Sequence, residues 1–250
     1  MKTLISILIV LLGAGCGEFK KGYEKGVERQ KKAAQERAKA SNPGPPKATP
    51  EKLINDPIIE KAIRKELYKP TGVLTKAHLK ILYGLRLENN QLTELPSKDL
   101  EKLTHIKSLD LSGNQLTNVN GLEKFTQLRR LSLNGNQLTD VKGLEKLTQL
   151  EDLKLDGNQL TDVKGLENLD QLHFLSLNGN QLTDVKGLEK LTKLKVLSLR
   201  RNQLTDLQGL KRLTKLQLLG LEGNPGLTRA QIDELDGALP LWTFIPSDEK

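Results

Sequence analysis

Leucine recurs at fixed positions through most of this chain. In a unit of 22 residues, leucine or a similar apolar residue stands at positions 1, 4, 6, 11, 14, 17 and 20, and most other positions are polar or glycine. One copy places these residues at Leu150, Leu153, Leu155, Leu160, Val163, Leu166 and Leu169. A fixed period of this length is the mark of a solenoid, in which each coil packs on its neighbours. The pattern therefore predicts stacked coils around one continuous apolar core.

The spacing within the unit changes along its length. Positions 4 and 6, such as Leu153 and Leu155, are two apart and point to the same side of a short strand. Later apolar residues fall every third position, which predicts a tight 3₁₀-like or extended return in place of a long helix. A glycine at position 16 allows a bend in this return. These glycines are Gly121, Gly143, Gly165, Gly187 and Gly209.

An asparagine occupies position 9 of all seven copies. The seven are Asn90, Asn114, Asn136, Asn158, Asn180, Asn202 and Asn224, with a first interval of 24 residues and later intervals of 22. The chain must turn sharply after each strand, and a buried backbone group without a partner costs about 1–3 kcal/mol. Because an amide both donates and accepts hydrogen bonds, one asparagine per coil can bridge its own and the adjacent backbone. We therefore predict a structural ladder of asparagines.

The unit L-x-x-L-x-L-x-x-N-x-L resembles the leucine-rich repeat, from Leu82 to Leu227. Its length and the phrase LTDVKGLEKLTQL are similar to the bacterial internalin type. The resemblance implies an α/β solenoid, a right-handed leucine-rich repeat horseshoe with parallel strands on its concave face and helical caps at both ends. It also implies recognition of a partner. The pattern departs at residues 96–99, which lengthen the first interval, and at Pro225 and Gly226 in the last copy.

Both caps can be read from the sequence. Residues 51–81 predict a helical N-terminal cap, because Asp56 and Pro57 are good helix-starting residues. Ile59, Ile63 and Leu67 then share one helical face, and a second short helix begins at Thr75 and brings Leu79 and Leu82 to the first coil.

Residues 228–250 predict a helical C-terminal cap after the repeats of residues 82–227. Thr228 and Gln231 fit a capping box. Ile232, Leu235 and Leu239 follow on one face, Pro240 ends the helix, and Trp242 and Phe244 close the last coil.

Residues 1–15 read as a lipoprotein signal peptide. Lys2 precedes a short apolar run, which is too short to span a bilayer. The run ends in Leu12-Gly-Ala-Gly-Cys16, which resembles a bacterial lipobox although Gly13 departs from it. The resemblance implies lipidation of Cys16 and anchoring in the cell envelope, at the outer membrane or cell surface. The alternative is ordinary cleavage after Gly15, which gives a secreted or periplasmic protein.

Positive charge lies outside the repeats. Of the net charge of +8, residues 1–16 carry +1, residues 17–50 carry +5 and residues 51–81 carry +3, whereas residues 82–250 carry −1. No basic stripe runs along the repeats, which argues against binding nucleic acid. Residues 16–50 therefore read as a charged tether with a proline-rich end. Such a basic segment can lie on anionic lipid, or it can be a solvated spacer.

No pattern in the chain indicates catalysis. It contains no phosphate-binding glycine loop, no H-E-x-x-H and no cysteine pair. His78, His105 and His173 lack metal-ligand spacing and are expected at the surface. We predict a protein that is not an enzyme and that needs no metal or cofactor.

The copies differ most at positions 3, 5 and 7, which the family resemblance places on the concave face. Phe174, Val196 and Leu218 occupy position 3 of consecutive copies and predict a contiguous apolar strip. The alternative is that the strip only packs adjacent coils or lies under the C-terminal cap. The predicted ligand-binding set also contains polar residues, namely Arg130, Asp152, Lys154, Asp156 and Arg200.

These observations favour an envelope-anchored, monomeric module that binds a protein or peptide on its concave face. A structural spacer of the envelope is the first alternative, and binding of carbohydrate or peptidoglycan is the second. Carbohydrate binding prefers aromatic platforms, but aromatic residues make up only 3% of the chain.

Overall fold

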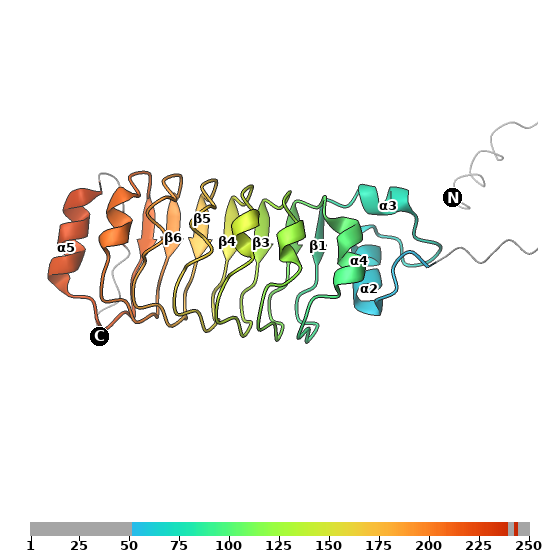
Figure 1. Ribbon diagram of the computed structural model, residues 1–250, viewed down its shortest axis with the longest axis horizontal. Coiled ribbons are helices and arrows are strands. Elements are labelled where there is room, and N and C mark those ends of the chain that lie inside the picture. Colours follow the sequence, from blue (N-terminus) through green and yellow to red (C-terminus); the bar gives the residue numbers. More distant parts are fainter. Residues whose placement is uncertain (1–51, 240–242, 245–250) are drawn as a thin grey trace, which may run out of the picture. The chain divides into compact units, whose positions relative to one another are not determined.

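The computed structural model describes residues 52–239 together with residues 243 and 244. In this part of the chain the repeats form a stack of coils, and each coil adds one short strand to a single parallel sheet (Figure 1). The strands are β1 (Gly84–Arg86), β2 (Ser108–Asp110), β3 (Arg130–Ser132), β4 (Asp152–Lys154), β5 (Phe174–Ser176), β6 (Val196–Ser198), β7 (Leu218–Gly220) and β8 (Thr243–Phe244). They follow one another in chain order within the sheet. This topology confirms the predicted leucine-rich repeat solenoid.

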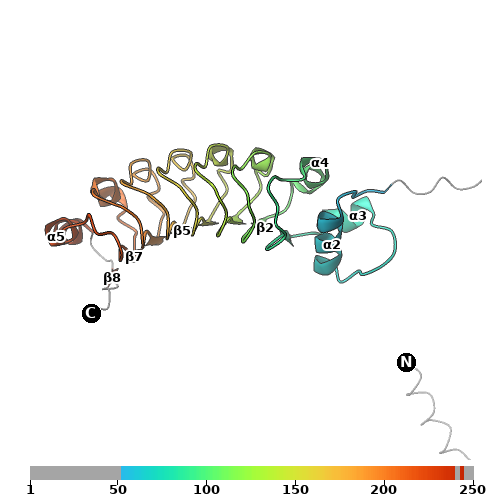
Figure 2. The same ribbon diagram turned by 90° about the horizontal axis from the view of Figure 1, so that it is seen from below.

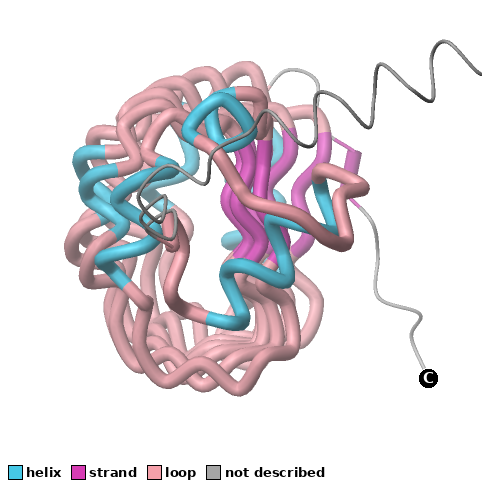
Figure 3. The backbone as a smooth tube through the Cα atoms, turned by 90° about the vertical axis from the view of Figure 1, so that its right-hand side faces the viewer, coloured by secondary structure: helices cyan, strands magenta, loops and turns pink. Residues whose placement is uncertain are grey.

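The return segments run along the side of the stack opposite the strands (Figures 2 and 3). They contain the 3₁₀ helices η1 (Glu101–Leu103), η2 (Leu122–Lys124), η3 (Leu144–Lys146) and η4 (Gln208–Arg212). The returns after β4 and β5 pass through turns. The prediction of a tight return is therefore confirmed in the central coils. The stack of coils bends with its strands on the inner side, which we call the concave face (Figure 2).

One apolar core fills the stack from Ile54 to Leu239. The two leucines of each unit that flank position 5, such as Leu153 and Leu155, have no exposed surface in the central coils. A fully buried leucine side chain stabilises the fold by about 1.5–3 kcal/mol. Since every coil repeats the same buried set, the stability of the domain is spread evenly along its length.

Each internal asparagine of position 9 bridges two coils. The Asn158 Nδ2 atom donates to the Leu155 carbonyl of its own coil and to the Leu133 carbonyl of the preceding coil, both at 3.0 Å. Its Oδ1 atom accepts from the backbone N–H of Leu138 at 3.1 Å. The same three kinds of bond are made by Asn114, Asn136, Asn180, Asn202 and Asn224. Asn90 is in the first coil, and its Nδ2 atom donates to the Glu88 carbonyl of that coil.

The N-terminal cap consists of α2 (Pro57–Glu66) and α3 (Lys76–Lys80). The Asp56 carboxylate caps α2 by accepting from two backbone N–H groups at 2.8 and 2.9 Å. Thr75 starts α3 in a reciprocal capping box with His78. Ile59 and Ile63 of α2 and Leu79 of α3 are buried against the first coil. Apolar burial on one side of each helix thus closes the open end of the core.

The two extra residues of the first interval lie in a helical turn, α4 (Ser97–Leu100). Asp99 of this turn is only 4% exposed, and its Oδ2 atom accepts from the backbone N–H groups of Asn55 and Asp56, each at 2.7 Å. Its Oδ1 atom lies 2.8 Å from Nζ of Lys102, which also donates to the Leu53 carbonyl. The insertion therefore joins the first coil to the entry of the N-terminal cap.

Asp99 gives the stability of the cap a pH dependence. Burial would raise the pKa of its carboxyl group, but the bonds from Lys102, Asp56 and Asn55 outweigh burial and hold this pKa below its ordinary value. Because the folded-state pKa is the lower one, the carboxylate stabilises the fold fully above about pH 4, and this stabilisation is lost as the pH falls through the folded-state pKa. Asp99→Ala is expected to lower the free energy of unfolding by about 2–4 kcal/mol at pH 7.

Denaturant unfolding between pH 7 and pH 3 checks this expectation. The difference between the wild-type protein and Asp99→Ala should shrink as the pH falls. The exposed Asp140, which accepts only a local backbone bond from Lys142, provides the control variant Asp140→Ala. A difference that is the same at pH 7 and pH 3 would contradict the role of the Asp99 carboxylate.

The bend in the return depends on glycine to a different degree in different coils. Gly121 and Gly165 both have left-handed backbone angles, with φ of 92° and 100°. A Cβ atom at Gly121 would meet nothing within 4 Å, whereas one at Gly165 would lie 2.8 Å from the Val141 carbonyl oxygen. Gly165→Ala is therefore expected to cost about 3 kcal/mol and Gly121→Ala about 1 kcal/mol. If the two variants lose equal stability in thermal unfolding, the left-handed backbone angle alone determines the effect of the substitution, and the contact with the Val141 carbonyl oxygen does not contribute. Gly209 of the same series lacks the left-handed angle.

The C-terminal cap is the helix α5 (Arg229–Ala238). Thr228 and Gln231 form the predicted capping box, and the Gln231 side chain also donates to the Thr205 carbonyl of the preceding coil at 2.7 Å. Leu235 and Leu239 are buried. Phe244 belongs to β8, which pairs with β7, while Trp242 and Pro240 lie outside the described residues.

Several sequence predictions also fall outside the described residues. They are the signal peptide of residues 1–15, the lipidation of Cys16 and the tether of residues 16–50. Among the residues that the structure describes, no helix is long and apolar enough to cross a membrane.

Candidate functional site

The three apolar residues of position 3 lie side by side on the concave face. Phe174 pairs in register with Val196, and Val196 with Leu218, on the adjacent strands β5, β6 and β7. Phe174 and Val196 are half-buried, and Leu218 is 41% exposed. We call these three side chains the apolar strip. Their neighbours at position 4, Leu175, Leu197 and Leu219, are buried in the core, so the strip lies on the other side of the sheet.

The C-terminal end of the chain borders the strip. Thr243 of β8 pairs in register with Leu218. Leu218 nevertheless keeps a large exposed fraction, and it is the only large hydrophobic side chain strongly exposed in the described residues beyond Tyr83. The strip is therefore accessible at its C-terminal end and is not closed by the described part of the cap.

Charged residues adjoin the strip on its N-terminal side. Asp152 of β4 lies between Arg130 and Phe174 in the same row of paired residues. The Lys154 ammonium lies 5.7 Å from the centre of the Phe174 ring, within the range of a cation–π contact. Arg130 and Lys154 are exposed, and Asp152 is partly exposed. Sequence reasoning placed these four side chains in one set, and the structure brings them together.

Two residues of the predicted set are engaged in internal bonds. The Asp156 Oδ1 atom accepts from the Ser176 hydroxyl at 2.6 Å and from the backbone N–H of Asn178 at 2.8 Å. Nε of Arg200 donates to the Glu222 carboxylate at 2.5 Å. Both side chains therefore join neighbouring coils, whatever else they contact.

Asp156 belongs to a second row of hydrogen bonds that sequence reasoning missed. The position-7 side chains of Asn134 and Asn178 likewise accept from the backbone N–H of position 7 in the following coil, at 2.8 Å. Asn178 also accepts from the Ser198 hydroxyl at 2.7 Å. The signal was present in the sequence, because Asn, Asp and Asn occupy position 7 of three consecutive copies. Part of the variation on this face thus has a structural cause.

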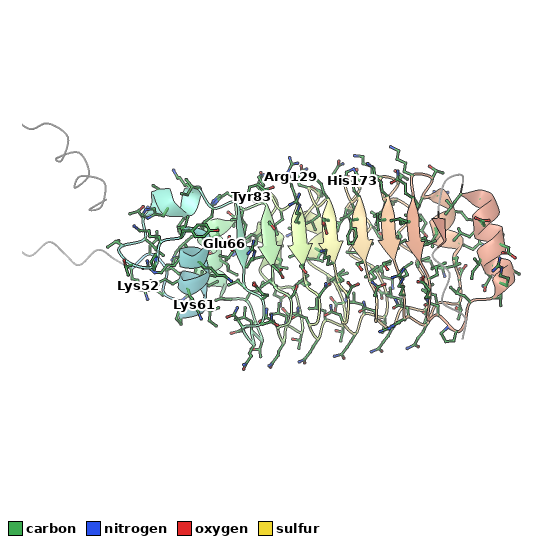
Figure 4. All side chains as sticks on the ribbon, turned by 180° about the vertical axis from the view of Figure 1, so that it is seen from behind. Lys52, Lys61, Glu66, Tyr83, Arg129 and His173 are labelled. Carbon is green, nitrogen blue, oxygen red and sulfur yellow. The ribbon has the colours of Figure 1, made fainter. Side chains whose placement is uncertain are left out.

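The concave face is hollowed at its N-terminal corner. A depression of about 370 Å³ lies between the end of α2 and the first strands, and its floor includes Gly84 and Ser108. Figure 4 shows Tyr83 beside Glu66 at this corner. A second hollow of about 160 Å³ shares Ser108 and Arg130 with the first and reaches Asp152 and Lys154. The two hollows therefore lie one after the other on the side of the concave face between the N-terminal cap and the apolar strip.

The titratable residues of the described part of the chain show no arrangement that suits a metal ion. No group of three or more His, Cys, Asp or Glu side chains there can hold a metal ion. His78 serves the capping box of α3, and Nε2 of His105 lies 3.0 Å from the Leu79 carbonyl oxygen. His173 is partly exposed at the edge of β5 (Figure 4).

Comparison with known proteins identifies the repeats. A family model described as leucine-rich repeats in two copies matches residues 126–168, 170–212 and 192–237, and a second leucine-rich repeat model matches residues 80–138. Together they cover more than half of the chain. A search of curated proteins gave no match.

Solved structures of internalins from Listeria monocytogenes share the fold. Internalin C2 (inlC2) has a TM-score of 0.66 and 27% identity, over 77% of this chain and 94% of that chain. The internalin inlF has a TM-score of 0.55 and 23% identity, over 77% of this chain and 69% of that chain. The functional domain of InlJ, which includes a cysteine ladder, has a TM-score of 0.53 and 26% identity, over 62% of this chain and 33% of that chain.

The repeats mark a protein-interaction scaffold. Their sequence pattern, the matching family models and the shared fold show that this chain is a bacterial, internalin-type member of the leucine-rich repeat family.

Proposed function

We propose that this protein is an envelope-anchored, non-catalytic module that binds a protein or peptide on its concave face. The observation that carries the proposal is the apolar strip. A regular solenoid needs its apolar side chains inside the coils, and the strand leucines of this one are buried. Phe174, Val196 and Leu218 stand on the opposite side of the sheet in consecutive coils, where they add little to the core. Clustered apolar side chains with a charged border are typical of protein-recognition surfaces.

The polar neighbours of the strip support binding of a protein or peptide. Arg130, Asp152 and Lys154 offer both signs of charge within two adjacent strands. A partner that places an apolar side chain on the strip can pair its own charged groups with these residues. The two hollows of the concave face extend the surface open to a partner from the apolar strip to the N-terminal corner of the sheet.

Crosslinking in cells tests the proposal. A photoreactive amino acid at Val196 is expected to give a discrete protein adduct that mass spectrometry identifies. The same amino acid at Thr161, which is exposed on the return segment, is the matched control and should not give that adduct. Identical adducts from both positions, or no protein adduct from Val196, would contradict recognition on the concave face.

The envelope anchor needs a separate measurement, because it depends on Cys16. Mass spectrometry of the N-terminal peptide should find a lipid on Cys16, and Cys16→Ser should release the protein from the membrane fraction. An unmodified Cys16 would favour the secreted or periplasmic alternative and would leave the concave-face proposal intact.

A further inference from the structure

Exposed apolar side chains are concentrated in the N-terminal cap and just after it. Among the described residues, five large hydrophobic side chains are strongly exposed, and four of them lie between residues 68 and 83. These four are Tyr68, Val73, Ile81 and Tyr83. Tyr68 is the extreme case at 94% exposure. The concave-face proposal makes no use of Tyr68 or Val73.

The backbone holds Tyr68 outward. It has a left-handed φ of 50° directly after the C-cap residue of α2, where glycine is the usual residue. A tyrosine in this conformation is strained, because its Cβ atom crowds the backbone. The Arg64 guanidinium donates to the carbonyls of Lys69 and Gly72, at 3.3 and 2.9 Å, and so fixes the loop that follows. The backbone of this hydrogen-bonded loop therefore keeps the Tyr68 ring exposed to solvent.

Tyr68 borders an open hollow on the outer side of α2. The hollow has a volume of about 700 Å³. We call it the tyrosine hollow, and it is lined by Pro57, Glu60, Lys61, Arg64, Lys65, Tyr68 and Pro70. Its one acidic group, Glu60, is already paired with Lys52 and Arg64 at 2.9 and 2.7 Å. Lys61 and Lys65 are exposed, and Nζ of Lys65 lies 4.0 Å from the Glu88 carboxylate. The lining of the hollow still holds more basic than acidic side chains.

The chain enters the domain beside this hollow. The described structure begins at Lys52, which contacts Glu60 of the hollow and lies with Lys61 at the N-terminal end of the domain (Figure 4). Residues 17–50, which precede it, carry a net charge of +5. A lipid on Cys16 would bring a bilayer within reach of the same end of the domain. The position of the entry point and the sign of the charge both favour an anionic membrane as the surface that meets the hollow.

We propose that the tyrosine hollow is a contact site for an anionic lipid surface. Tyrosine is favoured at membrane interfaces because its ring is apolar and its hydroxyl is wet. Lysines near an anionic bilayer contribute about 1 kcal/mol each, which is about a fivefold gain in binding. The contact directs the N-terminal cap to the bilayer and the far coils away from it. This inference takes from the proposed function only the membrane anchor at Cys16. The vesicle experiment below tests it with a protein that lacks that anchor.

Vesicle binding tests the site. The chain from residue 16 with Cys16→Ser retains the tether and every described residue, but it cannot be lipidated. We expect it to bind vesicles that contain phosphatidylglycerol and not vesicles of phosphatidylcholine alone. Lys61→Glu with Lys65→Glu should weaken binding at least about tenfold. Lys142→Glu with Lys164→Glu changes the net charge equally at exposed residues of the return segments, and should weaken binding much less.

Tyr68→Gly separates the aromatic contact from simple charge attraction. Glycine relieves the left-handed backbone, so this variant should melt at the same or a higher temperature. It should nevertheless bind the anionic vesicles several-fold more weakly.

The proposal is overturned if both charge-reversal pairs weaken vesicle binding equally, if Tyr68→Gly binds as tightly as the parent protein, or if the parent protein does not bind vesicles. It is also overturned if the hollow captures an envelope protein in place of lipid. None of these results depends on a ligand of the concave face.

Discussion

Replacing both Phe174 and Val196 by serine is expected to lower capture of the protein partner from envelope extract at least about 100-fold. Each apolar side chain that a partner buries fully contributes about 1.5–3 kcal/mol, so losing two removes about 3–6 kcal/mol of binding. The fold should survive, because the core beneath the strip is made by Leu175 and Leu197, which are unchanged. Since Phe174 and Val196 are only half-buried, the melting temperature should fall by no more than a few degrees.

A matched variant exists on the N-terminal cap. Tyr68→Ser with Val73→Ser also removes one aromatic and one valine side chain, from exposed positions outside the concave face. Capture by this variant, measured in membrane-free extract, should equal that of the wild-type protein. If the Phe174 and Val196 variant captures its partner as well as the wild type does, the apolar strip is not the binding site.

Asn158→Ala is the second large effect, and it acts on stability. The side chain is 7% exposed and makes hydrogen bonds of 3.0–3.1 Å to three backbone groups of two coils. Alanine leaves the N–H of Leu138 and the carbonyls of Leu133 and Leu155 without these partners. At about 1–3 kcal/mol for each buried unsatisfied group, partly relieved by relaxation, we expect a loss of about 3–5 kcal/mol. Equilibrium denaturant unfolding measures this loss.

Two other amide positions calibrate the measurement. Gln159 is the exposed neighbour of Asn158, and Gln159→Ala should change stability by less than about 0.5 kcal/mol. Asn90 is only partly buried, and its Nδ2 atom donates within the first coil, so Asn90→Ala should cost about 1 kcal/mol. If the asparagines act as a ladder, the loss of unfolding free energy is largest for Asn158→Ala, smaller for Asn90→Ala and smallest for Gln159→Ala. Equal losses at Asn158 and Asn90 would contradict it.

Local patterns in the sequence predicted most of the scaffold. The repeat of about 22 residues placed the strands β1 to β7, because burial of the same leucines forces the same backbone path in each coil. The helix starts at Asp56, Thr75 and Thr228 were also predictable, since a cap depends on residues within three or four positions. The grouping of Arg130, Asp152, Lys154 and Phe174 followed from register, which a repeat fixes once its period is known.

Contacts between distant segments were not predictable. Asp99 binds backbone groups more than 40 residues earlier, and nothing in its neighbourhood distinguishes it from a surface aspartate. The corner depression needs α2 to pack against β1, which no periodic pattern specifies. The internal bonds of Asp156 and Arg200 were missed for a related reason. Variation between copies predicted exposure, but exposure does not exclude bonds to the next coil.

The asparagine ladder allows the number of coils to change while the two caps stay the same. Every rung from Asn114 onwards joins one coil to the coil before it, so inserting or removing a whole unit leaves the other rungs unchanged. Each unit changes the separation of the two caps by about 4.8 Å, the spacing of neighbouring strands. The same event changes which side chains become neighbours, because loss of the coil that contains Asp152 would place Phe174 next to Arg130. One duplication or deletion of 22 residues therefore changes both the length of the domain and the set of neighbouring side chains on its concave face.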